Sequence, residues 1–481
     1  MWNHPSSPQD VIDSYQIQWE QAIASQNFLP FIFPYSVSNY GLLVLYLLYS
    51  RTRLARKSKY AIFTAIVWLS IAIMSGCRTL SLDYGVLIGI MSSWCIVWSS
   101  TLIIFHNPHQ DFYRLVKTSR KSHQRDTRQN REVYHAPESS NPNRAPENLQ
   151  PGQQTGHPDY VWEAMPDTFW KRFGWTLDLV TSLRGLHWSW RSTCIPSISS
   201  FRARPTQRRP FQAALWLIFI YLGLDVLNII GKTDPYFWGI INPSESYLSI
   251  SHTYHIFITF LNLMFANLAV FNIPPLLCVH ILGPSILGSL SEPWMYSTAP
   301  GPIEIILNNG LQGFWNSWWH QMFRFGLSSP GVWLVDRLGI VRSSAIAKTL
   351  RITVAFALSG MVHACGCYTQ WPATSSLKLF FAFMLQPVGM VVQDMITLAV
   401  CEYSRFDGVL KPAFVVFWLW LTFEFALDEY ARGGMWLVEP LPFSPLRSLG
   451  FGPAQEGWWL WRGLVPHFHQ GEHWWQWGLA L

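Results

Sequence analysis

The sequence predicts an all-α, polytopic membrane protein, and three observations carry that prediction. Half of the 481 residues are hydrophobic and only 13% are charged, against about 25% charged in soluble domains. Aromatic residues make up 16% of the chain and include 27 tryptophans, a residue enriched where membrane proteins meet the bilayer interface. Several apolar runs are also long enough to cross the hydrocarbon core, which takes about 20 helical residues.

Eight runs meet that length, so we expect about eight transmembrane helices. They lie at residues 30–49, 60–77, 84–106, 212–230, 255–282, 350–370, 378–400 and 413–430. Pro30 and Pro34 weaken the first run, and Pro274 and Pro275 should kink or break the fifth, because proline lacks the amide hydrogen that a helix interior needs. No internal repeat is evident, which is unfavourable to a transporter built from two halves.

These runs divide the chain into four parts. The first three helices occupy 1–106, a polar loop occupies 107–211, a membrane core occupies 212–430, and a Trp-rich segment occupies 431–481. The seven cysteines fall mostly in or beside apolar runs, so neither a disulfide framework nor a zinc site is expected. The amino-terminal residues lack a basic region and an apolar core, and we expect no cleaved signal peptide.

Basic loop residues predict the orientation in the membrane. The stretch RTRLARKSK (51–59) carries five basic residues and the loop 107–211 carries many more, so both should be cytoplasmic. Within that loop, 117–158 has the polar composition of a disordered segment. Its basic residues either keep the loop on the cytoplasmic side of the membrane or attract anionic lipid. Residues 167–192 mix aromatic and basic side chains, as an amphipathic segment in the interface does. The expected location is the endoplasmic reticulum membrane.

The stretch FWNSWWHQMFR (314–324) sets polar residues among large aromatic ones. If it is helical, Asn316, His320 and Arg324 share one face, with Gln321 beside them. A surface helix would not surround such a stripe with tryptophans. The stripe therefore faces a polar cavity or lies at a membrane surface, and topology places it in the cytoplasmic region between the fifth and sixth runs.

A second histidine, His363, lies inside the sixth apolar run, in the stretch LSGMVHACGCY (358–368). An ionisable residue at membrane depth usually faces a cavity or a partner, and the small residues around it allow a neighbouring helix to approach closely. Two interpretations stay open: a neutral histidine bonded between helices, for example to Ser359, or a cavity-lining base. A buried imidazole tends to stay neutral, and a neutral imidazole is suited to accepting a proton from an alcohol.

At these residues the sequence resembles the membrane-bound O-acyltransferases, in particular their wax-synthase-like branch. FWNSWWHQMFR resembles its F-W-x-x-x-W-H motif, SGMVH (359–363) its S-G-x-x-H motif, and FAFMLQPVGMVVQD (381–394) the glutamine-containing span that follows. The likeness runs from about Leu177 to Tyr430 and includes LRGLHWSW (183–190). Many members carry a Glu-Asp pair where this chain has Gln393-Asp394, which leaves the role of position 393 open.

The resemblance implies a helical bundle that encloses a catalytic tunnel. It implies acyl transfer from acyl-CoA, most specifically acetyl-CoA, to a hydroxyl of a lipophilic terpenoid or meroterpenoid alcohol, as in fungal secondary metabolism. His363 would be the catalytic base, His320 the assisting residue and oxyanion donor, and Asn316 a second donor. Arg324 and Gln321 would bind the CoA co-substrate. Membrane lipids surround such an enzyme, and neither a metal nor a nucleic-acid partner is expected.

Two alternatives remain. One is a long-chain wax ester synthase, since acyl length depends on the tunnel. The other is a membrane transporter with His363 as a proton relay, which explains the buried histidine but not the aromatic motif.

Three other polar patterns are judged not to be catalytic centres. HNPHQD (106–111) fits the H-x-x-x-x-D pattern of another acyltransferase class, but a chain of this composition gives such matches by chance. HFHQGEH (467–473) resembles one histidine box of a membrane di-iron enzyme, and no second box is present in the sequence. Glu424 lies in the last apolar run and would line the cavity or pair with another polar group.

Overall fold

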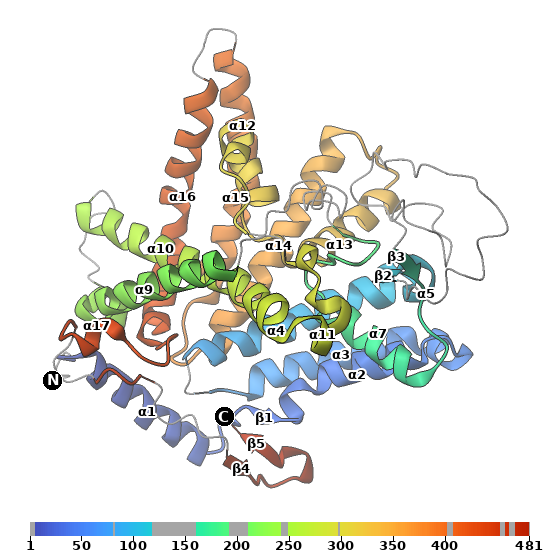
Figure 1. Ribbon diagram of the computed structural model, residues 1–481, viewed down its shortest axis with the longest axis horizontal. Coiled ribbons are helices and arrows are strands. Elements are labelled where there is room, and N and C mark those ends of the chain that lie inside the picture. The colour runs from blue at the N-terminus through green and yellow to red at the C-terminus, as the bar shows by residue number, and fades with distance from the viewer. Residues whose placement is uncertain are drawn as a thin grey trace.

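The protein is described by a computed structural model that covers residues 5–79, 82–117, 160–191, 210–241, 249–296, 299–401, 407–452, 457–460 and 467–480. Helices dominate the described part, which confirms the all-α prediction (Figure 1). The strands are short: β1 (Ile32–Phe33), β5 (Gly478–Ala480) and β4 (His467–His469) form one antiparallel sheet in that order, and β2 (Arg114–Lys117) pairs with β3 (Tyr160–Glu163).

Seven helices in the described part are long and apolar enough to cross a membrane. They are α3 (Arg53–Gly76), α4 (Leu82–Ser99) with its π-helical extension η2 (Ser100–Phe105), α9 (Pro210–Thr233), α10 (Ile250–Pro275) with η4 (Leu276–Leu282) and α11 (Gly283–Leu287), α14 (Ala345–Thr369), α15 (Ser376–Cys401) and α16 (Asp407–Arg432). They correspond to seven of the eight expected spans, and the chain is an integral membrane protein.

The first expected span, 30–49, contains a shorter helix. Helix α2 (Ser38–Tyr49) has 12 residues, about 18 Å of helix, against a hydrocarbon core of about 30 Å. Residues 32 and 33 instead form β1, flanked by Pro30 and Pro34 and paired with the carboxy-terminal strand β5. The prolines and the strand pairing therefore remove the first third of the expected helix.

The remaining helices are shorter. They are α1 (Pro8–Ala24), η1 (Tyr35–Val37), α5 (Pro108–Asp111), α7 (Phe169–Thr181), η3 (Pro235–Trp238), η5 (Gly288–Ser291), η6 (Pro293–Met295), α12 (Glu304–Gly313), η7 (Phe314–Trp318), α13 (Arg324–Arg337), η8 (Met435–Leu437), α17 (Pro445–Ser448) and η9 (Trp474–Gln476). Helix α7 lies within the expected amphipathic segment and buries Trp175 and Leu179 while Phe169 and Trp170 are exposed. The expected disordered segment 117–158 lies outside the described residues except for Lys117.

The expected disruption at Pro274 and Pro275 is confirmed. Helix α10 ends at Pro275 and continues as the π-helix η4, because two consecutive residues there have no amide hydrogen to give to the helix.

Helix α14 lies between α4, α13 and α15 and carries the buried histidine of the sixth run (Figure 1). The expected close approach of helices at its small residues is also confirmed. A methyl group on Gly360 would lie 3.0 Å from the carbonyl oxygen of Phe380 in α15, and one on Gly366 would lie 3.0 Å from Ile90 in α4. These contacts draw the neighbouring helices tightly around His363.

Candidate active site

The stretch 314–324 is not one continuous helix, and the expected polar stripe is wrong in its geometry. Helix α12 passes into the π-helix η7, which ends at Trp318. Trp319 is extended, and Phe323 has a φ of +67°, before α13 begins at Arg324. We call residues 319–323 the break. The amide of Trp319 still donates to the Phe314 carbonyl at 2.7 Å, so the five-residue turn of η7 closes and the chain then leaves the helix.

The segment that leads into the break packs against two spanning helices. The side-chain oxygen of Gln393 in α15 accepts a hydrogen bond from the Leu311 amide at 2.8 Å. About two turns earlier in α15, Gln386 accepts from the Trp315 indole at 3.2 Å and donates to the Thr422 hydroxyl in α16 at 3.0 Å. Irregular backbone at membrane depth is tolerated where protein surrounds it and satisfies its polar groups. These glutamines meet that requirement.

Gln321 and Arg324 contact the backbone on both sides of the break. The Gln321 amide nitrogen donates to the Trp319 carbonyl at 3.0 Å, and Arg324 donates to the Gln321 side-chain oxygen at 2.8 Å and to the Asn316 carbonyl. Both side chains therefore hold the shape of the break. The side chain of Asn316 is exposed, and no described hydrogen bond joins it to either histidine.

His320 lies within the break and is held in its neutral form. Its Nδ1 atom is buried and has no hydrogen-bond partner among the described residues. Burial, and to a smaller extent positive charge on His363 and on Arg184, lower the pKa of His320 to about 3. Aromatic contacts link the two imidazoles: Phe383 contacts both His363 and Trp315, and Trp319 contacts both Trp315 and His320. His320 is therefore neutral across the physiological pH range and able to donate from a ring N–H.

His363 lies three quarters of the way along α14, and one nitrogen of its ring is fixed. Its Nδ1 atom is 2.8 Å from the backbone carbonyl oxygen of Ser359. A carbonyl only accepts, so Nδ1 carries the hydrogen, and Nε2 of the neutral ring carries the lone pair. The ring stacks on Phe383 of α15 with centroids 4.3 Å apart. A hydrogen bond to the Ser359 backbone agrees with the interpretation of His363 as a neutral, hydrogen-bonded residue of the bundle. The same bond leaves Nε2 as the basic nitrogen, which agrees with the interpretation as a base.

A third element, from the loop 107–211, closes around the break. Residues 183–190, the LRGLHWSW stretch, follow α7, and the carbonyl of Leu183 accepts from the Phe323 amide at 3.0 Å. Arg184 on this stretch is partly buried, and burial lowers its pKa to about 10. The sequence analysis included this stretch but assigned no role to Arg184. An arginine within a stretch rich in tryptophan was the feature that could have indicated a functional residue.

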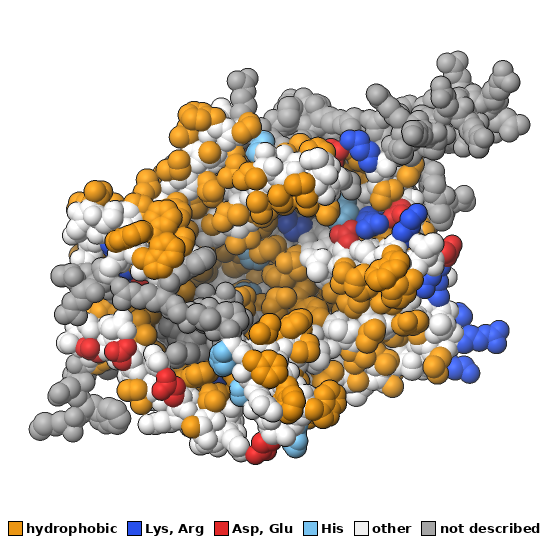
Figure 2. Space-filling model, turned by 60° about the horizontal axis from the view of Figure 1, so that its bottom comes forward, with side chains coloured by type: hydrophobic (Ala, Val, Ile, Leu, Met, Phe, Trp, Pro, Cys, Tyr) orange, Lys and Arg blue, Asp and Glu red, His pale blue; other side chains and the backbone are white. Residues whose placement is uncertain are grey.

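Two pockets adjoin this region. One of about 270 Å³ is lined by residues 181–187 together with Met295 and Met322, and so reaches the break. Figure 2 shows a face that is hollowed near its centre, with mostly hydrophobic walls and with basic and histidine side chains visible inside the hollow. A pocket that reaches the break from a largely hydrophobic face suits a lipophilic substrate.

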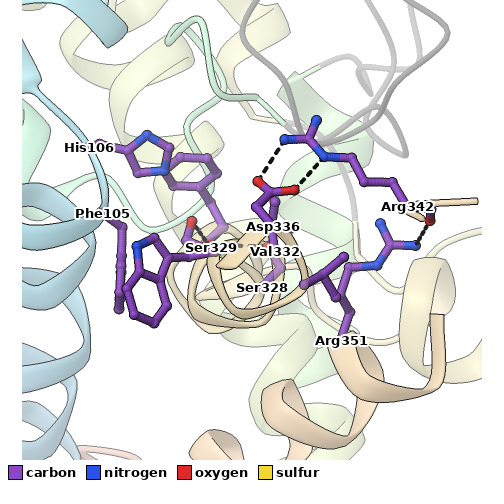
Figure 3. A pocket seen from close by; sticks show the side chains of 11 residues that line it. Phe105, His106, Ser328, Ser329, Val332, Asp336, Arg342 and Arg351 are labelled. Atoms are coloured by element: carbon purple, nitrogen blue, oxygen red, sulfur yellow. Dashed lines mark hydrogen bonds and ion pairs between the residues drawn. The ribbon is translucent and has the colours of Figure 1, made fainter. Parts of the chain in front are cut away.

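The second pocket, of about 170 Å³, lies between the end of η2 and α13 (Figure 3). It contains His106, whose ring stacks on Phe325 with centroids 5.2 Å apart and whose Nδ1 lies 3.5 Å from Asp111. Asp336 forms a two-bond ion pair with Arg342 at 2.6 and 2.7 Å. Within the HNPHQD stretch, His106 thus packs on Phe325 and pairs with Asp111. The pocket of about 170 Å³ that it lines shares no lining residue with the pocket of about 270 Å³ that reaches the break.

The remaining polar patterns have structural contacts. The Glu472 carboxylate accepts from Gln26 at 3.0 Å, joining the carboxy-terminal segment to α1 and its loop. The carboxylate of Glu424 lies 3.8 Å from the His252 ring of α10, which agrees with the expectation that Glu424 pairs with another polar group. Within the described ranges, no group of three or more His, Cys, Asp or Glu side chains is arranged to hold a metal ion.

Residues 302–385 match the profile of the membrane bound O-acyl transferase family. This region begins just before α12 and contains Asn316, His320, Arg324 and His363. This part of the chain is therefore similar to the membrane bound O-acyl transferase family. The similarity agrees with the seven spanning helices of the described part.

Several fungal proteins are similar to this chain. It is 28% identical over 284 residues to the O-mevalon transferase macI of Penicillium terrestre, covering 54% of this chain and 60% of the relative. It is 26% identical over 227 residues to the acetyltransferase ple2 of Rhodocybe pseudopiperita, covering 44% and 53%. It is 25% identical over 215 residues to the O-mevalon transferase yanI of Aspergillus niger, covering 41% and 46%.

The aligned regions thus span about half the length of these curated relatives. No solved structure matches the chain.

Proposed function

We propose that this protein is an acyl-CoA-dependent O-acyltransferase that transfers an acetyl group to a hydroxyl of a lipophilic alcohol, a terpenoid or meroterpenoid of secondary metabolism. The observation that carries the proposal is the orientation of His363: its Nε2 lone pair is left for a substrate, at membrane depth, beside a second neutral imidazole. The acyl-transferase names of the relatives support the reaction class, and the acetyltransferases among them support acetyl.

In the proposed reaction, the acceptor hydroxyl lies at Nε2 of His363. Alcohols are weak nucleophiles at neutral pH, so proton transfer to Nε2 accompanies attack of the oxygen on the thioester carbon. The carbonyl electron pair moves onto oxygen, where His320 donates a hydrogen bond, with Asn316 as a second donor. Collapse re-forms the carbonyl and breaks the carbon–sulfur bond, and His363 returns the proton to the leaving thiolate of CoA.

The surroundings of the site support this chemistry. Water in the site would hydrolyse the thioester, and the hydrophobic hollow and closely packed helices exclude it. The membrane core 212–430 would then be the catalytic part of the chain, in the endoplasmic reticulum, with acyl-CoA reaching it from the cytosol. Gln321 and Arg324 are proposed to contact the CoA moiety on the outer side of the break, in addition to holding its backbone.

The test uses the full-length protein in membranes or detergent, with acetyl-CoA and longer acyl-CoAs offered against terpenoid and fatty alcohols. Release of free thiol that depends on the alcohol, with an acetyl ester identified by mass spectrometry, is the expected result. Esters formed only from long acyl chains and fatty alcohols would make the protein a wax ester synthase. Absence of acyl transfer with every pair, together with proton-coupled uptake into vesicles, would make it a transporter.

The role of His363 is tested in the same assay with activity normalised to correctly inserted protein. His363→Gln keeps much of the side-chain volume but has no basic nitrogen, so turnover should fall by about 10²–10⁴-fold. His320→Ala is the comparison at the second imidazole and should leave more activity than His363→Gln. Parent-like turnover by His363→Gln would reject the assignment of the base.

A further inference from the structure

The LRGLHWSW stretch forms one wall of the site that carries His320. Its backbone is bonded to the break through Leu183 and Phe323 at 3.0 Å. Trp190 at its end stacks on Phe325, in the first turn of α13, with ring centroids 4.9 Å apart, and packs edge-on against Trp98 of α4. The stretch is therefore fixed to both the break and the helix bundle.

A polar network holds this wall from its other side. His187 lies 2.9 Å from Asp178 in α7, and Arg114 of β2 donates to the same carboxylate at 3.1 Å and to Glu163 of β3 at 2.7 Å. The His187 carbonyl also accepts from the Leu115 amide at 2.7 Å. Burial alone would raise the pKa of Asp178, but the bonds from His187 and Arg114 lower it. The Asp178 carboxylate thus stays charged at neutral pH and holds His187 and Arg114 together.

Arg184 extends from this wall into the pocket of about 270 Å³ that reaches Met322. Its guanidinium lies 4.8 Å from the ring of Phe271 in α10, so it bridges the wall and a spanning helix. Its charge acts on His320, two residues before Met322. The pocket therefore places a cation close to the break, two residues along the chain from the imidazole that is proposed to face the thioester carbonyl.

We propose that Arg184 is a catalytic residue that contacts the carbonyl oxygen of the acyl donor and stabilises its negative charge in the tetrahedral intermediate. The inference rests on the proposed acyl transfer. As the acceptor oxygen bonds to the thioester carbon, the carbonyl electron pair moves to oxygen, and the guanidinium N–H groups face it together with His320. The charge returns to the carbonyl bond when the carbon–sulfur bond breaks and the thiolate takes the proton from His363.

A phosphate contact fits this position less well. The phosphates of CoA are separated from the thioester by the whole pantetheine arm, whereas Arg184 lines a pocket that reaches Met322 in the break and follows Leu183, which is bonded to Phe323. A preplaced cation in a dry site acts most strongly on charge that develops during the reaction. The two roles differ in kinetics, because a phosphate contact strengthens substrate and transition state alike.

The experiment compares Arg184→Gln with Arg184→Lys and with Arg191→Gln. Arg191 is a partly buried arginine at the end of the same segment that does not line the pocket, so its substitution controls for loss of a semi-buried cation. Arg184→Gln should lower kcat by about 10²–10³-fold, as loss of an oxyanion donor does, with the KM for acetyl-CoA and the Kd for CoA within about twofold of the parent. Arg184→Lys should keep more activity than Arg184→Gln, and Arg191→Gln should turn over like the parent.

The outcomes separate the two proposals. If the parent transfers no acyl group, the proposed function fails. If the parent is active and Arg184→Gln raises KM with kcat unchanged, or matches the parent, the inference about Arg184 is overturned. If the Arg184→Gln protein does not accumulate, Arg184→Met replaces it in the test, because a methionine side chain can pack against Met295, Met322 and the Phe271 ring. A kcat for Arg184→Met as high as that for Arg184→Lys would then overturn the inference.

Discussion

Gly310 is the position at which a single methyl group should disturb the active site most clearly. Inside α12 it has φ +55° and ψ −133°, a conformation that only glycine adopts without strain. A Cβ there would lie 2.3 Å from the amide nitrogen of Gln393 and 2.4 Å from its oxygen. Gly310→Ala should therefore both strain the backbone and displace the side chain that accepts the Leu311 amide.

The magnitude follows from these two effects. A non-glycine residue in such a backbone region costs about 1–3 kcal/mol, and leaving the buried Leu311 amide without its acceptor costs about 1–3 kcal/mol more. At a few degrees per kcal/mol in a large domain, the apparent Tm should fall by on the order of 10 °C. Activity should fall further than stability, because Gly310 precedes Trp315 and the break in the same segment.

The assay is thermal unfolding in detergent followed by acyl transfer at a temperature where both proteins remain folded. Gly41→Ala is the matched control: Gly41 lies in helix α2, and a methyl group there meets no atom within 4 Å. Alanine is favoured over glycine in a helix by about 0.5–1 kcal/mol, so this control should melt at or slightly above the parent. If Gly310→Ala melts and turns over like Gly41→Ala, the hydrogen bond between Leu311 and Gln393 is not what holds the site.

Four further predictions concern other parts of the chain. The pKa of His320 is lowered from 6.5 to about 3, so between these two pH values the unfolded state binds more protons than the folded state. The parent protein should therefore lose stability as the pH falls from 6.5 towards 3. The His320→Asn variant should lose less stability over the same range, and Tm measured against pH tests both expectations. His320→Asn should also retain more activity than His320→Ala, since an amide still donates to an oxyanion. Replacing 117–158 with a short polar linker should leave acyl transfer largely intact, and complete loss in a correctly inserted protein would contradict its dispensability. Single cysteines placed in 51–59 and in 107–211 should react with an impermeant reagent from the cytosolic side; labelling from the lumen would overturn the orientation.

The sequence predicts the spanning helices well because apolar length alone decides most of them. Seven of the eight expected spans are helices of sufficient length in the structure. The exception, 30–49, depended on a competing interaction that apolar composition does not reveal: pairing of Ile32 and Phe33 with a strand more than 440 residues away. The prolines on either side were the local indication that this run would not be helical throughout.

The site was predictable in its residue types but not in its local geometry. The stretch 319–323 contains neither glycine nor proline, so periodicity favours a continuous helix through His320. The helix is interrupted because tertiary contacts compensate for its lost hydrogen bonds: Gln321 and Arg324 bind its carbonyls, and Leu183 accepts the Phe323 amide. Arg184 was missed for the same reason, since it lies over 130 residues from His320 in sequence.

The hydrogen-bond partners of the two imidazoles favour different roles for them. His363 has its Nδ1 hydrogen directed at a backbone carbonyl, so its tautomer is fixed and its lone pair stays at Nε2, which a base requires. His320 has no partner at Nδ1 within the described residues, and burial and the neighbouring charges strongly disfavour its protonation. A group that resists protonation is a poor base, but it remains a good N–H donor to an oxyanion. If His320 were the base instead, it would have to accept a proton although the charge of Arg184 disfavours its protonated form. If His363 were the oxyanion donor, its Nδ1 hydrogen would have to leave the Ser359 carbonyl that it contacts.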